Sequence, residues 1–133
     1  MEEILLDSVI LIDHFNRIPQ ETTYIDQVQD RAVISVITRA EVLTGFDDES
    51  SRMLAIRFLD RFPVLEVTKQ IADSTARLRQ EHGWKLPDAL QAAMAKYHHL
   101  KLATRNTKDF SPQKHNFVVV PYVLDSPRQK SSG

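Results

Sequence analysis

Apolar and polar positions follow one another in short blocks along the chain, and the blocks predict strands and helices in alternation. The first block, Ile4 to Ile12, is apolar except for Asp7 and Ser8. A run this apolar is typical of a strand covered on both faces, with Asp7 at the point where the strand opens onto a cleft. Shorter runs rich in β-branched or apolar residues predict four more strands, at 32–35, 63–67, 101–104 and 117–120.

Between the strands, apolar residues recur at helical spacing. The segment 52–62, for example, carries Leu54, Phe58 and Leu59 on one stripe. Thr38 and Glu41 have the spacing of a capping box, which predicts a helix that begins at Thr38. The predicted helices are 21–30, 38–46, 52–62, 69–82 and 86–99, with one or two helical turns at 13–18.

This alternation predicts one α/β domain at 1–124 with a mainly parallel sheet. The polar tail at 125–133 is expected to be disordered. Ligands of such sheets bind beyond the carboxyl ends of the strands. Asp7, the segment 35–38 and the segment 104–109 all lie at such ends, so the fold gathers them in one place.

Composition narrows the function classes. The chain has no cysteine, which excludes disulfides and thiolate metal sites and fits a cytoplasmic protein. No apolar run is long enough to span a membrane, and the acidic start Met1-Glu2-Glu3 lacks the basic region of a signal peptide. A net charge of -1 gives no overall basic signal for nucleic acid. A nucleic-acid enzyme can still have this net charge, because acids that hold metal ions lower the net charge while the metal ions face the phosphate.

Four acids stand at the expected ligand edge: Asp7, Glu41, Asp88 and Asp109. Each has a local structural interpretation as well, namely a helix cap, half of a capping box, an acid at a helix start and a turn residue. Taken together, however, several carboxylates facing one cleft repel one another unless a cation lies between them. Oxygen ligands without Cys or paired His favour Mg²⁺ or Mn²⁺ over Zn²⁺.

Four segments, 6–12, 35–45, 86–93 and 103–110, resemble in order and spacing the PIN-domain ribonucleases, in particular the VapC-type toxins of toxin–antitoxin pairs. The resemblance implies a three-layer α/β/α sandwich and a Mg²⁺- or Mn²⁺-dependent endoribonuclease. Asp7, Glu41 and Asp88 match the family's acids, and Asp109 is our choice for the variable fourth position. Ser8, Thr104 and Asn106 match supporting polar positions.

In this interpretation the bound metal activates a water that attacks an RNA phosphodiester in line, without the 2′-hydroxyl as nucleophile. Arg39, Lys85, Arg105 and Lys108 flank the acids, as contacts for RNA phosphates or as ordinary solvated bases. The expected partners are a structured RNA such as tRNA, an antitoxin protein and a second copy of the chain. Residues expected to line an antitoxin groove, or simply to pack in the core, are Tyr24, Ile25, Phe46, Phe58 and Phe62.

Two departures from the family pattern leave alternatives open. His98-His99 replaces a glycine found in many relatives, and Asn106 replaces an acid kept in other PIN proteins. A non-catalytic PIN-like module that binds RNA or protein, or an RNA-processing nuclease without antitoxin, would share the same segments. A dehalogenase-like phosphatase fits poorly because Val9 stands where a second Asp is needed. A response-regulator receiver fits poorly because the third strand ends without an Asp.

Overall fold

The computed structural model describes residues 2–124, and the tail expected at 125–133 lies outside the described residues. Within the described part, five parallel strands form one sheet in the order β3-β2-β1-β4-β5. The strands are β1 (Ile4–Leu6), β2 (Ala32–Ser35), β3 (Val64–Leu65), β4 (Lys101–Ala103) and β5 (Val118–Val119).

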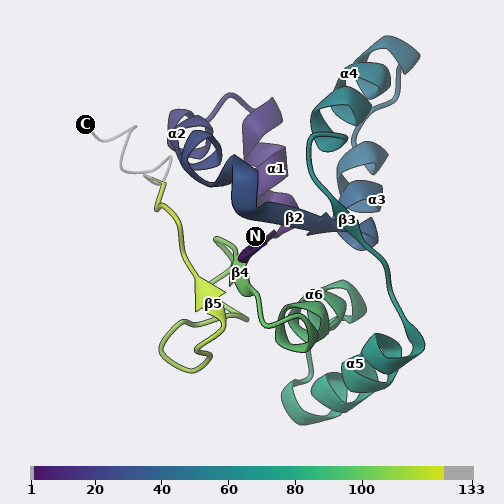
Figure 1. Ribbon diagram of the computed structural model, residues 1–133, viewed down its shortest axis with the longest axis vertical. Coiled ribbons are helices and arrows are strands. Elements are labelled where there is room, and N and C mark those ends of the chain that lie inside the picture. The colour runs from purple at the N-terminus through teal and green to yellow at the C-terminus, as the bar shows by residue number, and fades with distance from the viewer. Residues whose placement is uncertain (1, 125–133) are drawn as a thin grey trace.

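Helices cover both faces of the sheet, which confirms the three-layer α/β/α sandwich (Figure 1). Helices α1 to α4 lie on one face, and the antiparallel pair α5 and α6 lies on the other. None of the helices between residues 2 and 124 has the length and apolar character needed to cross a membrane. Their bounds are α1 Ser8–Phe15, α2 Pro19–Val28, α3 Val36–Thr44, α4 Glu49–Leu59, α5 Lys69–His82 and α6 Leu86–Tyr97, with a 3-10 turn at Gln29–Arg31.

The central strand β1 divides the core in two. Leu5 packs toward α5 and α6, whereas Ile4 and Leu6 pack toward the helices of the other face. This follows from the alternation of side chains along a strand. All three side chains are buried, so the apolar start of the chain fixes the middle of the sandwich.

The first apolar block is not one strand, which corrects the prediction for residues 8–12. Strand β1 ends at Leu6, and α1 begins at Ser8 because Asp7 caps it: its Oδ1 accepts a hydrogen bond from the Ser8 amide at 2.9 Å. Ile10 and Leu11 of α1 are buried as fully as the strand. The apolar run alone therefore does not distinguish a buried strand from a buried helix.

The predicted capping box is also wrong. Helix α3 begins at Val36, and its cap is Ser35, whose Oγ accepts a hydrogen bond from the Thr38 amide at 3.1 Å. Glu41 is therefore not paired with a Thr38 cap and stands exposed on α3. In contrast, α5 keeps its predicted bounds, from the Thr68 cap to Gly83, whose φ of 70° only glycine adopts without strain.

The strand order places the carboxyl ends of β1 and β4 side by side, at the point where the order in which strands are added to the sheet reverses. From β1 the chain continues to β2 and β3 on one side, and it later returns to β4 and β5 on the other. Such a reversal is the usual ligand position in a parallel α/β sheet. Asp7 directly follows β1, and Thr104 directly follows β4.

Candidate active site

Asp7 lies at the centre of the site and accepts hydrogen bonds from α1, from α6 and from the residue that follows β4. Its Oδ2 accepts a hydrogen bond from the Thr104 hydroxyl at 2.7 Å, and its Oδ1 accepts from the Ser8 amide and, at 3.3 Å, from Nε2 of Gln91. Asp7 is only 6% exposed. Each carboxylate oxygen carries two lone pairs, so these three bonds orient Asp7 and leave one lone pair of Oδ2 free to bind a cation.

Gln91 is a site residue that the sequence interpretation missed. It is buried on α6, one turn after Asp88, and its Nε2 also donates to the Thr38 hydroxyl at 2.7 Å. Its Oε1 accepts from the Ser35 hydroxyl at 2.7 Å. Gln91 thus connects α6 to the ends of β1 and β2. The sequence did contain one signal for Gln91: it is a single amide side chain among the alanines of α6.

Asp88 opens α6 close to the other three acids. Burial, and after it repulsion from Asp7, Asp109 and Glu41 in that order, raise the pKa of Asp88 to about 6 against the opposing charge of Lys85. Within residues 2–124, none of the four acids forms an ion pair with a basic side chain. Four elements therefore bring uncompensated carboxyl groups within electrostatic range of one another.

Asn106 and Asp109 occupy the loop after β4 and contact each other. Nδ2 of Asn106 donates to Oδ2 of Asp109 at 3.2 Å, and the backbone N–H of Asn106 donates to the Thr104 hydroxyl at 3.0 Å. The Thr104 hydroxyl in turn donates to Asp7, so the loop contacts Asp7 through Thr104. The loop is thereby tied to the strand ends, with Asp109 on its half-buried side.

The donor set suits a hard divalent cation. The oxygen donors are carboxylates with a neighbouring hydroxyl and amide, as Mg²⁺ and Mn²⁺ prefer. In the described part of the chain, no three Asp, Glu or His side chains converge closely enough to form a ready-made cage. Mg²⁺ does not require one, because it keeps several waters and uses one or two carboxylates beside substrate phosphates. The mutual repulsion recorded at Asp88 is what such an ion would relieve.

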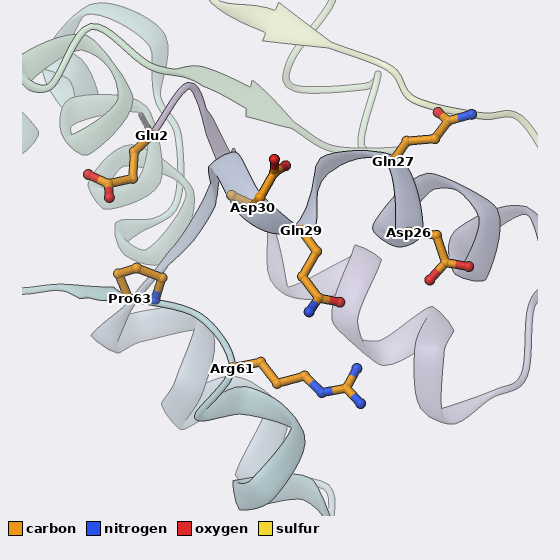
Figure 2. A pocket seen from close by; sticks show the side chains of 8 residues that line it. Glu2, Asp26, Gln27, Gln29, Asp30, Arg61 and Pro63 are labelled. Atoms are coloured by element: carbon orange, nitrogen blue, oxygen red, sulfur yellow. The ribbon is translucent and has the colours of Figure 1, made fainter.

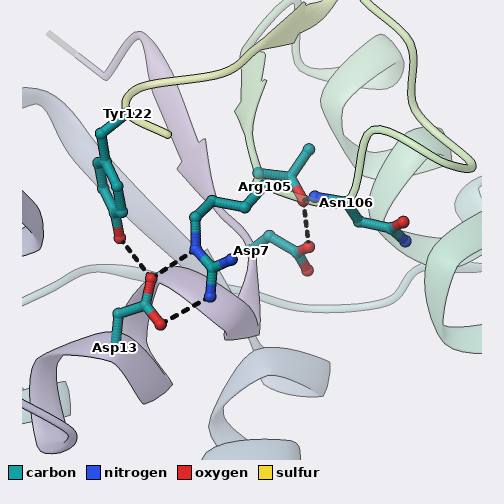
Figure 3. A network of polar contacts seen from close by, with 6 residues as sticks. Asp7, Asp13, Arg105, Asn106 and Tyr122 are labelled. Carbon is teal, nitrogen blue, oxygen red and sulfur yellow. Dashed lines mark hydrogen bonds and ion pairs between the residues drawn. The ribbon is translucent and has the colours of Figure 1, made fainter. Parts of the chain in front are cut away.

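Two of the four candidate phosphate contacts are engaged by acids. Arg39 pairs with Asp60 on the exposed surface at 2.9 Å. Arg105 donates twice to Asp13, at 2.7 and 2.8 Å (Figure 3). Lys85, before α6, and Lys108, beside Asp109, are exposed and form no ion pair within residues 2–124.

The Asp13–Arg105 pair belongs to a buried polar cluster beside the site. The Tyr122 hydroxyl donates to Oδ2 of Asp13 at 2.8 Å, and Asp13 is only 3% exposed. Burial, together with this bond, raises the pKa of Tyr122 above its usual range. Arg105 stands between Thr104 and Asn106, so the cluster anchors the loop after β4 to α1 and to the segment after β5.

Glu21 adds a buried acid near this cluster and gives a stability prediction. Burial raises the pKa of Glu21 to about 7, its side chain is fully enclosed, and its Oε2 has no partner in the described part of the chain. A raised folded-state pKa means that stability is full below about pH 4.5 and is lost as the pH rises toward 7. We expect Glu21→Gln to be more stable than wild type by about 2 kcal/mol at pH 8. The advantage should vanish near pH 4.5 in urea unfolding curves, and an advantage independent of pH would contradict this assignment.

Asp88→Asn gives a second stability prediction. At neutral pH, repulsion between the Asp88 carboxylate and its acidic neighbours destabilises the folded wild-type chain, and an uncharged amide at this position removes that repulsion. We expect the variant to gain about 1 kcal/mol in EDTA at pH 7.5, after allowance for solvent screening of a half-buried group. Because the pKa of Asp88 rises from 3.8 to about 6, the gain should develop between pH 4 and pH 6. Thermal unfolding tests it, and a less stable variant at pH 7.5 would show that the acids do not repel.

The pockets differ in character. One of about 580 Å³ lies at the opposite, amino edge of the sheet, and Figure 2 shows its polar side chains, among them Asp26, Gln29 and Arg61, pointing in different directions. Another, of about 280 Å³, lies between α1 and α3 and is lined by Ile12, Phe15 and Phe46 beside Glu41.

The second of these pockets tests the expected groove residues. Phe46 lines it. Ile25, Phe58 and Phe62 are instead at most 7% exposed and pack in the core, the second of the two interpretations given for them. Tyr24 is half-buried and packs against the same core.

Comparisons with known proteins agree with this geometry. The family model of the PIN domain matches residues 4–112. A toxin–antitoxin complex from Klebsiella pneumoniae contains a similar chain, 35% identical over 92% of this chain and 100% of that one, with a TM-score of 0.85. VapBC-1 from Haemophilus influenzae is 25% identical over 84% and 92%, with a TM-score of 0.65. DNA-bound VapBC from Salmonella typhimurium, 22% identical over 83% and 91%, shares the fold with a TM-score of 0.73. A comparison with curated proteins finds no match.

Proposed function

The chain belongs to the PIN-domain family, and from this premise we propose that it is a metal-dependent endoribonuclease, the toxin of a VapBC-type toxin–antitoxin pair. The observation that carries the proposal is the group of four unpaired acids, Asp7, Glu41, Asp88 and Asp109, at the carboxyl edge of the sheet. Mutual repulsion of this kind, at the ligand edge of a parallel sheet, favours a bound cation. The cation can in turn bind a phosphate.

Each residue has a distinct role in the proposed reaction. Asp7 and Asp88, with Asp109, would hold the ion; Thr104 and Gln91 orient the oxygens of Asp7, and Asn106 orients Asp109. When bound, Mg²⁺ or Mn²⁺ supplies charge neutralisation at the scissile phosphate and a water of lowered pKa. Glu41, exposed at the rim, would help to hold the ion or accept a proton from a water molecule. The proposed reaction is a hydrolysis of the phosphodiester that does not use the 2′-hydroxyl as nucleophile.

Partners follow from the relatives. The similar chain from Klebsiella pneumoniae comes from a toxin–antitoxin complex, which supports a protein inhibitor for this chain. The apolar pocket lined by Ile12, Phe15 and Phe46 offers such an inhibitor a surface beside Glu41. A homodimer is the oligomer that the family resemblance implies, and a structured RNA such as tRNA is the proposed substrate class.

The test is cleavage of structured RNA by the purified chain, free of any co-purified inhibitor, in Mg²⁺, in Mn²⁺ and in EDTA. We expect cutting in both metals and none in EDTA. A substrate with a single 2′-deoxy sugar at the cleavage position should still be cut, because the 2′-hydroxyl is not the nucleophile. A folded chain that binds RNA but cuts in neither metal would instead establish a non-catalytic binding module.

A further inference from the structure

A pocket of opposite charge adjoins the four acids. His82 ends α5, Trp84 follows it in the loop before α6, and Lys108, Lys114 and His115 lie between β4 and β5. Together with Asp109 they border a volume of about 460 Å³, which we call the basic pocket. Asp109 belongs to both places, so the basic pocket opens directly beside the proposed cleavage site.

Aromatic packing fixes the wall of the basic pocket. The His82 ring stacks on Trp84, with centroids 4.1 Å apart and planes within 16°. Trp84 is itself only 6% exposed and packs edge-on against the fully buried Phe110 at 5.0 Å. The His115 ring lies 5.2 Å from the same indole. Both imidazoles are therefore held in position before a ligand binds, so binding costs less side-chain conformational entropy.

The charges around the basic pocket favour an anion. Lys108 and Lys114 are exposed, and neither amine forms an ion pair within residues 2–124. Asp109 is the carboxylate that lines the pocket, and Glu81 lies 3.6 Å from the outer nitrogen of His82. Burial lowers the pKa of His115, and the nearby cationic groups of His82, Lys96 and Lys114 lower it further. The positive charge that lines the pocket therefore comes from Lys108 and Lys114, and a bound anion would reduce the repulsion between them.

We propose that the basic pocket binds a backbone phosphate of the substrate strand next to the phosphate that is cleaved. This inference rests on the proposed function, because it extends the same site along the RNA. A chain with net charge -1 and four acids at its centre repels RNA overall, so a local group of cations has to hold the strand. Phosphate contacts of this kind set the position of the strand and read no sequence.

The test measures RNA binding apart from cleavage. The full chain carrying Asp7→Asn is titrated, in Mg²⁺, into a fluorescein-labelled single-stranded RNA of about twelve nucleotides, and anisotropy is followed at several salt concentrations. Adding Lys108→Gln together with Lys114→Gln should raise Kd about tenfold. The slope of log K against log salt should fall by about one for each lost phosphate contact. A loss of structure alone would not change that slope in this way.

Two controls isolate the basic pocket. Lys69→Gln removes one positive charge at the other end of α5, about 20 Å from His82, and should leave Kd and slope unchanged. Lys114→Arg keeps the charge and should bind like its parent. Unchanged affinity and slope in the double variant would overturn the inference. If wild type still cleaves RNA in metal, only the basic pocket fails; if the chain binds no RNA at all, the basic pocket and the proposed function fail together.

Discussion

Asp7→Asn is expected to lower RNA cleavage about 1000-fold and to leave the fold intact. A bound metal supplies several kcal/mol of transition-state stabilisation, and each tenfold in rate corresponds to about 1.4 kcal/mol. Asparagine keeps the shape of the side chain and one carbonyl oxygen, so it still caps α1 and still accepts from Thr104 or Ser8. What it loses is the negative charge. Single-turnover cleavage in Mg²⁺ measures the rate, and circular dichroism with thermal unfolding measures the fold.

A matched control for Asp7→Asn is Asp30→Asn. Asp30 is exposed at the amino edge of the sheet, across the molecule from the four acids, so its replacement should leave cleavage unchanged. Full activity of Asp7→Asn would contradict a metal role for this residue. An unfolded Asp7→Asn chain would show that its contribution is the helix cap and the bond to Thr104.

Asp13→Ala is expected to destabilise the fold by about 3 kcal/mol. The change leaves the partly buried Arg105 guanidinium without its counter-charge and removes the acceptor of the Tyr122 hydroxyl. Breaking a buried pair from one side usually costs 3–5 kcal/mol, and the residual exposure of Arg105 favours the lower end of that range, about 3 kcal/mol. In a domain of this size the melting temperature should fall by roughly 10 °C, measured by calorimetry.

The surface pair Arg39–Asp60 provides the control for that experiment. Asp60 is 62% exposed, so Asp60→Ala should cost less than about 1 kcal/mol although the two ion pairs have similar lengths. Equal effects of Asp13→Ala and Asp60→Ala would contradict the assignment of Asp13 as the anchor of the loop after β4. Because Arg105 adjoins Thr104, cleavage by Asp13→Ala should also decline at temperatures where the chain is still folded.

The sheet was predictable because its strands are marked by local apolar runs separated by helical spacing. Those runs place Asp7 and the segment after β4 at strand ends, and parallel strands bring their ends to one edge. The element bounds around Asp7 were less predictable. Residues 4–12 are apolar apart from Asp7 and Ser8, and both β1 and the middle of α1, at Ile10 and Leu11, are buried, so burial there carries no information about secondary structure.

The supporting contacts were not predictable, because they join residues far apart in sequence. Asp13 meets Arg105 across 92 positions, and Gln91 meets Asp7 across 84. Nothing local marks either pair, and the resemblance to the family named only the acids and their near neighbours. Phe58 and Phe62 illustrate a related limit: an apolar stripe shows that a helix face is covered, but not whether the core or a partner covers it.

The most direct measurement is a calorimetric titration of Mn²⁺ into the purified chain at pH 7.5, repeated with Asp7→Asn, Asp88→Asn and, as a control, Asp30→Asn. We expect wild type and Asp30→Asn to bind Mn²⁺ and the other two variants to lose most of the affinity. Binding should also weaken as the pH falls through about 6, where protons compete for Asp88. A folded wild-type chain that binds no Mn²⁺, or Asp7 and Asp88 variants that bind it as tightly as wild type, would contradict the claim that these acids form the metal site.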